Sequence, residues 1–432
     1  MELSQLYSSF LSCTSITTDT RSMKSGSMFF ALSGPNFNGN KFAKDALEKG
    51  ANYVVIDDEN FLEPSSKYIL VSDVLKALQE LATYHRHQLG CKVLALTGSN
   101  GKTTTKELVS RVLAKKYNIY FTQGNFNNHI GVPITILSAE KGIDFLVVEM
   151  GANHQGEIKN LCEIAQPDYG FITNIGKAHL EGFGGLEGVR KGKSEIYRYL
   201  DSNDGLIFVN VDNEELRALV HPHKNIHEYN NSSLKVQEST NYLKFTYEGF
   251  DYDSHLSGLY NLENIINAIQ IGCYFEVPLK DIAQAIKSYK PNNNRSESVK
   301  LGDITIFKDA YNANPTSLRA SLEGFLLKVS EGDKFKIILG DMLELGSYSE
   351  KEHHAILNYL VKNNIDEVVA IGPEFSKFSS DFPFEFYTNV DDYIVSLQID
   401  SIKGHQLFLK GSRGLKLERI VEKIQKYIEF IN

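Results

Sequence analysis

This sequence lacks paired cysteines and long hydrophobic runs. Its four cysteines lie far apart and form no C-x-x-C pair, so we expect reduced and mostly packed thiols, as in a cytoplasmic protein. No apolar stretch approaches the roughly 20 residues that a membrane-spanning helix needs. The first residues, MELSQLYSSF, lack a basic start and a sustained apolar core, so we expect no signal peptide. These absences favour a soluble cytoplasmic protein.

A long basic block is missing as well. The chain carries 45 Lys and Arg against 54 Asp and Glu, which gives a formal net charge of −9. Bulk attraction to nucleic acid or to an anionic membrane is therefore not expected, and any bound anion must be held by local groups. The 432 residues, 42% hydrophobic and 23% charged, are typical of a globular protein with two or three domains.

The rhythm of apolar runs predicts three domains. Residues 1–89 contain short strand-like runs at 27–32, 53–56 and 68–71, followed by a helix over 72–89 that Ser72 would cap. Residues 90–293 alternate apolar strands with helices, and the strands fall at 93–97, 145–150, 170–174 and 206–210. This alternation is typical of a parallel sheet covered by helices.

Within this second domain, residues 228–256 are rich in Tyr, Ser and Asn and predict a hairpin or strand insertion before a buried helix over 262–275. The tetrapeptide PNNN at 291–294 predicts a linker. Residues 294–432 then repeat the alternation, with strands at 304–307, 336–339, 368–371 and 407–409. The predicted fold class is therefore α/β, with mainly parallel sheets in the last two domains.

The stretch KVLALTGSNGKTT at 92–104 has the strand–loop–helix context of a phosphate-binding loop. Its glycines allow close approach to a polyphosphate, the helix N-terminus and Lys102 add positive charge, and the Thr103 hydroxyl can reach Mg²⁺. The usual loop has its first Gly where this chain has Leu96, and Gly98 is the nearest upstream glycine. This shortened form argues against most GTPases and motor ATPases. The alternative is a glycine turn with a chance lysine.

Polar side chains follow the predicted strands, where ligands of open α/β sheets bind. They are Glu149, the NIGKAH segment at 174–179, Asn210 and Asp212, and in the third domain Asp309, Asp341 and Lys410. Hard oxygen ligands and lysines beside one phosphate loop suit chemistry on a Mg²⁺–nucleotide.

Several of these residues keep a plainer alternative. Glu149 would bind Mg²⁺, or it is a capping or solvated acid. His179 would bind a second cation or a phosphate, or it is a structural histidine. The stretch GVRKGKSEI at 188–196 places Arg190, Lys191 and Lys193 close together, and its plainer alternative is a solvated basic turn. The pairs His221/His223 and His353/His354 lack ligand spacing, so we expect surface histidines.

Five motifs together resemble the Mur ligase family, the ATP-dependent amide-forming enzymes of peptidoglycan precursor synthesis. The short loop is similar to that family's own variant. Four further motifs of the family's central domain follow in the same order along this chain. They are GNFNNHIGVP at 124–133, VEMGANHQGEI at 148–158, NIGKAHLEGFG at 174–184 and GLYNLENIINA at 258–268. The family would place a uridine-nucleotide-binding domain at 1–89, the ATP-binding domain at 90–293, and at 294–432 a Rossmann-like domain that closes on ATP and binds the amine substrate.

The third domain narrows the resemblance to one branch. An Asp-Asn-Pro-Arg motif, typical of members that add diaminopimelate, is missing, whereas DAYNANP at 309–315 and LGDMLELG at 339–346 are similar to members that add D-alanyl-D-alanine. This implies UDP-MurNAc-tripeptide and D-Ala-D-Ala as substrates, ATP and two Mg²⁺ as cofactors, an acyl-phosphate intermediate and a monomer that neither binds nucleic acid nor inserts into a membrane.

The resemblance also implies roles for individual residues. Catalysis would involve Lys102, His179 and Lys193. ATP would be held by Gly98, Ser99, Asn100, Gly101, Lys102, Thr103, Thr104, Asn264, Arg295 and Asp309. The metals would be held by Thr103, Glu149, His179 and a carbamylated Lys193. Substrate contacts would come from Asp19, Thr20, Arg21, Asn127, Asn128, Tyr311, Asn312, Asn314, Lys410 and Ser412.

Two departures from the family pattern leave alternatives open. The residues around Lys193 read GKSE, where the family has a small residue and glycine, so Lys191 is an alternative. Tyr260 stands where the family has His. Three other functions compete: a Mur-type ligase for a different amino acid or dipeptide, a nucleotide-binding module without catalysis, and a small-molecule kinase.

Overall fold

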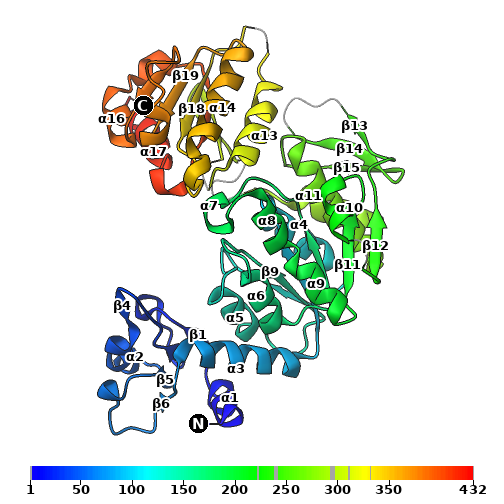
Figure 1. Cartoon of the computed structure of the whole chain (residues 1–432), viewed down its shortest axis with the longest axis vertical. Helices are drawn as coiled ribbons and strands as arrows, with labels where there is room; N and C mark the ends of the chain where they lie inside the picture. The colour runs from blue at the N-terminus through cyan, green and yellow to red at the C-terminus, as the bar shows by residue number, and fades with distance from the viewer. Residues whose placement is uncertain are drawn as a thin grey trace.

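The computed structural model describes residues 2–220, 223–237, 242–291, 297–309, 312–330 and 332–431. They form three α/β units along the long axis of the molecule, with the two termini in opposite end units (Figure 1). The predicted α/β class with mainly parallel sheets is confirmed. The linker residues Asn292 to Asn294 lie outside the described residues, as do Arg295, Tyr311 and His221, and the domain limits stay predictions.

The N-terminal unit is built on a four-stranded parallel sheet in the order β1-β2-β5-β6. These strands span Ile16–Thr17, Met28–Phe30, Tyr53–Ile56 and Tyr68–Leu70, and the short pair β3 (Ser33–Gly34) and β4 (Phe37–Asn38) lies apart. Side chains alternate between the two faces, so Met28 and Phe30 pack in the core that contains α1 (Leu3–Leu11) and α3 (Val74–Leu89). Phe29 packs in the core with α2 (Ala43–Glu48).

The predicted cap of α3 is wrong by one residue. The N-cap is Asp73, whose carboxylate accepts a hydrogen bond from the Lys76 backbone N–H at 2.9 Å. A carboxylate at this position also interacts favourably with the positive end of the helix dipole, which a Ser72 hydroxyl would not do.

The central unit has a six-stranded parallel sheet in the order β12-β11-β10-β7-β9-β8. Both faces are covered by helices, which explains the continuous apolar runs in the sequence. Val93 and Ala95 of β7 face one core, and Leu94 and Leu96 face the other. In chain order the strands are β7 (Lys92–Thr97), β8 (Ile119–Phe121), β9 (Phe145–Glu149), β10 (Tyr169–Ile172), β11 (Leu206–Asn210) and β12 (Ile226–Tyr229).

Two groups of helices cover this sheet. The core of Val93 contains α3 together with α5 (Gly131–Leu137), α6 (Glu157–Ala165), α9 (Glu195–Ser202) and α10 (Glu214–Val220). The core of Leu94 contains α4 (Lys102–Leu113), α11 (Tyr260–Tyr274) and α12 (Leu279–Ser288). The predicted insertion is an antiparallel three-stranded sheet made of β13 (Lys235–Gln237), β14 (Lys244–Tyr247) and β15 (Phe250–Asp253).

The C-terminal unit has a second six-stranded sheet in the order β16-β17-β21-β18-β19-β20, antiparallel only at β16–β17. Its strands are β16 (Glu297–Leu301), β17 (Ile304–Lys308), β18 (Phe335–Gly340), β19 (Val368–Ile371), β20 (Glu385–Tyr387) and β21 (Gln406–Lys410). One face packs with α13 (Pro315–Leu326) and α14 (Ser349–Lys362), and the other with α16 (Val390–Ser396) and α17 (Glu418–Ile431).

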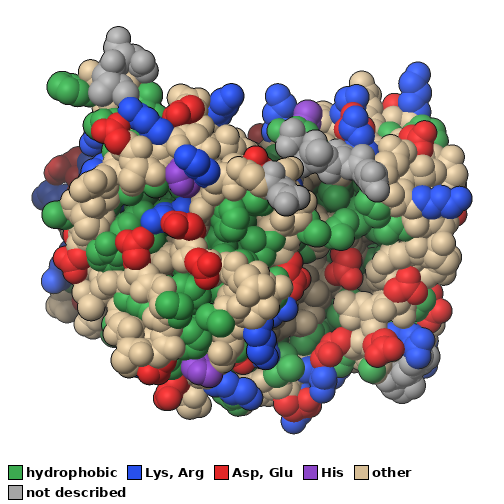
Figure 2. Space-filling view, turned by 90° about the horizontal axis from the view of Figure 1, so that it is seen from above, with side chains coloured by type: hydrophobic (Ala, Val, Ile, Leu, Met, Phe, Trp, Pro, Cys, Tyr) green, Lys and Arg blue, Asp and Glu red, His purple; other side chains and the backbone are tan. Residues whose placement is uncertain are grey.

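The surface carries both signs of charge. Acidic and basic side chains are intermixed over the face seen in Figure 2. Among the residues that the structure describes, no helix combines the length and the apolar character that a membrane crossing requires.

The helix α3 joins the N-terminal unit to the central one. It packs against α1 of its own unit and against α5 and α6 of the next. His85, on α3, is buried, and its ring lies 3.1 Å from the Tyr7 hydroxyl and 2.9 Å from the Ala139 carbonyl oxygen. The carbonyl requires a donor at Nε2, so the neutral ring accepts the Tyr7 hydroxyl at Nδ1.

This histidine predicts a pH-dependent component of stability. Burial lowers the pKa of His85 below its ordinary value. Below the ordinary histidine range the unfolded chain takes up a proton that the folded chain does not, so stability falls as the pH drops. We expect the urea midpoint to fall further between pH 7.5 and pH 5.5 in the parent protein than in His85→Gln, which keeps a donor and cannot titrate. Equal falls in both proteins would contradict the assignment.

Candidate active site

The phosphate loop joins the end of β7 to the start of α4 and is fastened to its neighbours. The Asn100 backbone N–H donates to Asn174 Oδ1 at 3.0 Å, and the Thr173 hydroxyl donates to the Asn100 carbonyl at 2.6 Å. The Ser99 hydroxyl donates to the Gly176 carbonyl at 3.0 Å. These bonds come from the segment after β10, the next strand of the sheet, so the loop has one defined shape.

Two glycines of this loop are required by close backbone approach. Gly98 has φ of +149°, and a Cβ there would lie 2.0 Å from Thr173 Oγ1. Gly101 has φ of +77°, and a Cβ there would lie 2.3 Å from Asn264 Oδ1. Any side chain at either position would displace a residue that shapes the loop.

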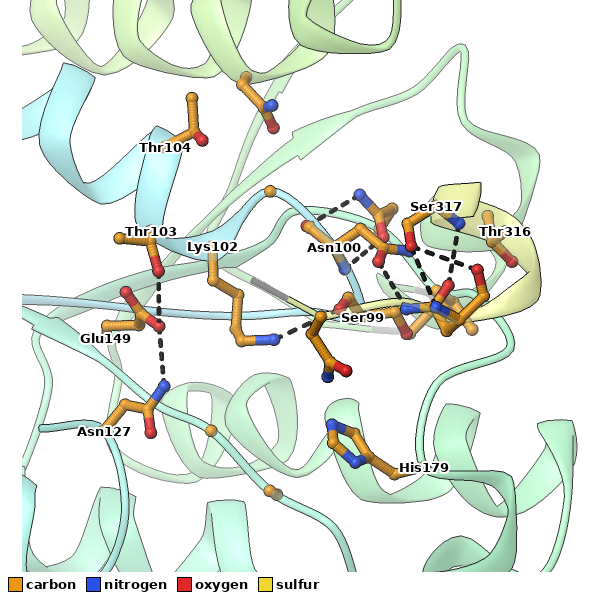
Figure 3. A pocket seen from close by; sticks show the side chains of 18 of the residues that line it. Ser99, Asn100, Lys102, Thr103, Thr104, Asn127, Glu149, His179, Thr316 and Ser317 are labelled. Atoms are coloured by element: carbon orange, nitrogen blue, oxygen red, sulfur yellow. Dashed lines mark hydrogen bonds between the residues drawn. The ribbon is translucent and has the colours of Figure 1, made fainter. Parts of the chain in front are cut away.

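The ammonium group of Lys102 lies over the loop. Its Nζ donates to the Gly98 carbonyl at 2.7 Å, and Figure 3 shows the side chain extended along the cavity wall. A cation at the N-terminus of α4 adds to the positive end of the helix dipole, which makes this edge of the cavity suited to phosphate.

A buried carboxylate faces the same helix end. Glu149, which ends β9, is 1% exposed, and its Oε1 accepts from Thr103 Oγ1 at 3.2 Å and from Asn127 Nδ2 at 2.8 Å (Figure 3). Its Oε2 has no hydrogen-bond partner among the residues that the structure describes. A buried carboxylate oxygen without a donor, beside a threonine hydroxyl, is a donor set suited to Mg²⁺.

Glu149 is supported from behind by Thr122, whose hydroxyl accepts the Glu149 backbone N–H at 3.0 Å. The Thr122 carbonyl in turn accepts from Lys106 Nζ at 2.6 Å, and Lys106 is fully buried. Lys106 lies one helical turn beyond Thr103 on α4, so the helix that carries the phosphate loop also holds the strand end that carries Glu149.

Lys193 ends α8 (Leu186–Lys193) and is 1% exposed. Its Nζ donates to the Ala152 carbonyl at 3.0 Å and lies 5.1 Å from the centre of the Phe183 ring. Burial and, to a smaller degree, the charge of Lys102 hold the pKa of Lys193 well below its ordinary value. The predicted alternative Lys191, on the same helix, is exposed.

The C-terminal unit supplies the opposite wall. Lys410, 2% exposed, forms an ion pair with Asp309. Asn314, the N-cap of α13, donates to Asn100 Oδ1 at 2.7 Å and so reaches the phosphate loop itself. The carboxyl ends of the two large sheets therefore meet at one place.

The result is a cavity of about 760 Å³ between the central and C-terminal units. Most of the predicted site residues line it: Ser99, Asn100, Gly101, Lys102, Thr103, Thr104, Asn127, Asn128, Glu149, His179, Asn264, Asp309, Asn312, Asn314 and Lys410. Gly98, Lys193 and Ser412 do not line the cavity, although each contacts residues or segments that do. Asp19, Thr20 and Arg21 lie in the N-terminal unit, outside it.

Comparison with known proteins identifies the family. Three family models match in order: "Mur ligase family, catalytic domain" at 12–86, "Mur ligase middle domain" at 96–272 and "Mur ligase, glutamate ligase domain" at 294–413. A relative from Bacillus subtilis is 34% identical over 94% of this chain and 92% of its own length, and one from Haemophilus influenzae is 33% identical over 96% and 94%. The chain belongs to the Mur ligase family.

Both of these relatives are named UDP-N-acetylmuramoyl-tripeptide–D-alanyl-D-alanine ligase. Among solved structures, this Mur ligase is similar to MurF from Acinetobacter baumannii, with a TM-score of 0.87 at 29% identity over 98% of each chain. It is also similar to MurF from Thermotoga maritima in complex with ADP, with a TM-score of 0.83 at 27% identity over 98% of this chain and 99% of that one.

The structure of this Mur ligase also brings in residues that the sequence argument missed. Glu263, beside Asn264 on α11, lines the cavity, and burial raises the pKa of its carboxyl group. Glu344 contacts His179 from the C-terminal unit. The helical pattern of the sequence does not distinguish Glu263 from the other residues of α11. Glu344 could be found only from the structure, because it reaches His179 across the contact between two units.

One prediction about histidines is wrong. His353 is fully buried. Both ring nitrogens have partners there, since Nε2 accepts the Met342 backbone N–H at 3.0 Å and Nδ1 lies 2.8 Å from the Ser349 carbonyl oxygen. His354 is exposed, as predicted. Among the described residues, no group of three or more His, Cys, Asp and Glu side chains is placed to share a metal ion.

The close approach at Gly101 predicts the effect of adding one methyl group. Gly101→Ala should weaken ATP binding strongly, because its Cβ would clash with Asn264 and disfavour the positive φ. The measurement is calorimetric titration with a non-hydrolysable ATP analogue. Gly142→Ala is the matched control, since Gly142 has φ of +93° but nothing within 4 Å of the added Cβ. Equal affinities of the two variants would contradict the prediction.

Proposed function

We propose that this Mur ligase joins D-alanyl-D-alanine to the carboxylate of UDP-MurNAc-tripeptide, with conversion of ATP to ADP and phosphate. The observation that carries the proposal is the shared cavity. Lys102 and the phosphate loop line one side of it, and Asn312, Asn314 and Lys410 of the C-terminal unit line the other. A nucleotide and an amine substrate can therefore meet within one cavity. The full-length similarity to D-alanyl-D-alanine ligases supports this choice of substrates.

In the first step, a carboxylate oxygen of the peptide attacks the γ-phosphorus of ATP, and the bond from that phosphorus to the ADP oxygen breaks. Both reactants are anions, so their approach is opposed by charge repulsion. Lys102 and the backbone N–H groups at the start of α4 offset this repulsion, because they are fixed in place before the substrates arrive. The product of the step is an acyl phosphate.

The residues fit a role for Mg²⁺. Thr103 and Glu149 would hold it, since Glu149 presents a buried oxygen without a donor in the described residues. When bound, Mg²⁺ would neutralise charge on phosphate oxygens. We extend the proposal to a second cation near His179, which lines the same cavity.

In the second step, the amine of the dipeptide attacks the acyl carbon, the carbon–oxygen bond to phosphate breaks, and the nitrogen loses a proton. Asn312 and Asn314 can orient the dipeptide, because both lie on the cavity wall. Lys410 forms an ion pair with Asp309, so we propose that it holds the Asp309 carboxylate in place. Its effect on the substrates would then be exerted through Asp309. Asp309 itself would contact the ribose of ATP.

We further propose that Lys193 is carbamylated. Carbon dioxide reacts with a neutral amine, and the lowered pKa of Lys193 favours that form at neutral pH. In the reaction the Lys193 nitrogen bonds to the carbon of CO₂ and loses a proton. The anionic carbamate would then lie near the positive charge of Lys102, which would offset part of the cost of burying it.

Further parts of the proposal rest on the sequence. Asp19, Thr20 and Arg21 would contact the uridine nucleotide, and the chain would work as a cytoplasmic monomer. The four cysteines are free, which suits a reducing compartment. The intermixed surface charges in Figure 2 suit a protein without a nucleic-acid partner.

Phosphate release tests the substrates. With UDP-MurNAc-tripeptide and ATP, we expect turnover only when D-Ala-D-Ala is added, because the cavity must accept a dipeptide amine. Single D-Ala and L-Ala should give no turnover, and omission of the tripeptide should abolish it. Turnover that needs only a free amino acid would overturn the dipeptide assignment, and turnover without any amine would favour a kinase.

Replacement of Lys193 tests the carbamate. Lys193→Ala should lower turnover on the order of 10²–10³-fold, as for loss of one preorganised charged group, and added acetate should restore part of it. With ¹³C-bicarbonate, a carbamate carbon signal should appear in the parent protein and vanish in Lys193→Ala. Lys191→Ala, on the exposed side of α8, is the control and should keep both activity and signal. The reverse pattern would assign the modification to Lys191.

A further inference from the structure

The contact between His179 and Glu344 joins two units of the chain at the edge of the cavity. His179 Nδ1 lies 2.5 Å from Glu344 Oε2. His179 follows β10 in the central unit and lines the cavity, whereas Glu344 belongs to the loop after β18 in the C-terminal unit. Because Nδ1 lies against this carboxylate, Nε2 is the ring nitrogen left for a group in the cavity. The His179 side chain is drawn in Figure 3.

Backbone strain marks both partners. His179 has φ of +53° and Glu344 has φ of +63°, a left-handed conformation that is strained for non-glycine residues. The Glu181 backbone N–H donates to the Glu344 carbonyl at 3.1 Å, so the two strained turns are also joined through the backbone. Strained residues that meet across an interface point to a functional constraint at this contact.

The loop that carries Glu344 is held firmly by its own unit. The Met342 backbone N–H donates to His353 Nε2 at 3.0 Å, and the Leu343 backbone N–H donates to the Ser412 hydroxyl at 2.9 Å. The Asp341 carboxylate accepts the backbone N–H groups of Glu374 and Phe375, both in α15 (Pro373–Ser376), at 2.8 and 2.9 Å. Glu344 therefore reaches a defined point on the other unit rather than sampling many.

We infer that Glu344 is a positioning residue for His179, which the C-terminal unit supplies only when it is docked on the central unit. A carboxylate on Nδ1 fixes the tautomer and the orientation of the ring and raises the basicity of Nε2. Docking of the two units and completion of the His179 side of the cavity are then one event. The inference deepens the proposed function and rests on it.

The same interface contains a second ion pair that serves as a control. Lys177 Nζ lies 2.6 Å from Glu352 Oε1, and Glu352 is 5% exposed. Neither Lys177 nor Glu352 lines the cavity. Loss of this ion pair should weaken docking without removing the carboxylate beside His179. A comparison of the two pairs therefore distinguishes a contact that only holds the units together from one that also positions His179.

The experiment compares Glu344→Ala and Glu344→Gln with Glu352→Ala and Glu352→Gln. For Glu344→Ala we expect kcat to fall on the order of 10–100-fold, as for other carboxylates that orient a functional histidine, with KM for ATP unchanged. Glu344→Gln should fall less, because its amide oxygen still accepts from Nδ1. The Glu352 variants should lose much less of kcat than Glu344→Ala, because they weaken docking but leave the Glu344 carboxylate beside His179. Equal losses of kcat at both positions would mean that Glu344 only holds the two units together, which would overturn the inference. An unchanged kcat in Glu344→Ala would overturn it as well.

A spectroscopic readout keeps this test separate from the proposed function. In protein labelled with ¹⁵N-histidine and free of substrates, the ring signals of His179, assigned with His179→Gln, should change in the Glu344 variants and not in the Glu352 variants. If the parent protein shows no dipeptide-dependent turnover, the proposed function fails while this readout still tests the contact. Ring signals that do not respond to Glu344→Gln or Glu344→Ala would overturn the inference, and thermal melts identify any variant that does not fold.

Discussion

The site depends on one constraint, the close approach of the phosphate loop backbone to the elements around it. Gly98 lies against Thr173 and Gly101 lies against Asn264, with no room for a methyl group at either place. The loop is therefore held between β10 and α11 before any ligand arrives. Because the backbone amides are already oriented, their partial charges act on a phosphate without a further cost of ordering. The positions of Lys102, Thr103 and Asn100 all follow from this fixed loop.

The parallel sheets bring the rest of the chemistry to that loop. Glu149 ends β9, the segment of His179 follows β10, and Lys410 ends β21 of the other large sheet. Buried strands with apolar residues on both faces require covering helices, and the helices in turn fix the strand ends. Lys106 shows how tightly this is coupled, because one buried side chain of α4 supports Thr122 and, through it, Glu149. The same packing that stabilises the central unit sets the geometry of its carboxylate.

Most of the sheet framework could be predicted from the sequence, because strands buried on both faces leave continuous apolar runs such as the one at 93–97. The phosphate loop could be predicted because its chemistry lies in neighbouring residues. The Lys410–Asp309 ion pair and the burial of His353 could not be predicted, since each depends on contacts between distant segments. Glu344 could not be found for the same reason. The capping of α3 by Asp73 rather than Ser72 shows the remaining uncertainty of a residue or so at helix ends.

The packing of the helix α3 bears on the distance that a bound molecule would have to span between the N-terminal unit and the phosphate loop. Its apolar side chains belong to the same continuous core as those of the N-terminal sheet and of α5 and α6. This packing opposes tilting of the N-terminal unit on the central one, and so it limits changes in the gap between the N-terminal unit and the phosphate loop. A molecule anchored at one end in the N-terminal unit has to span that gap to present its other end to Lys102.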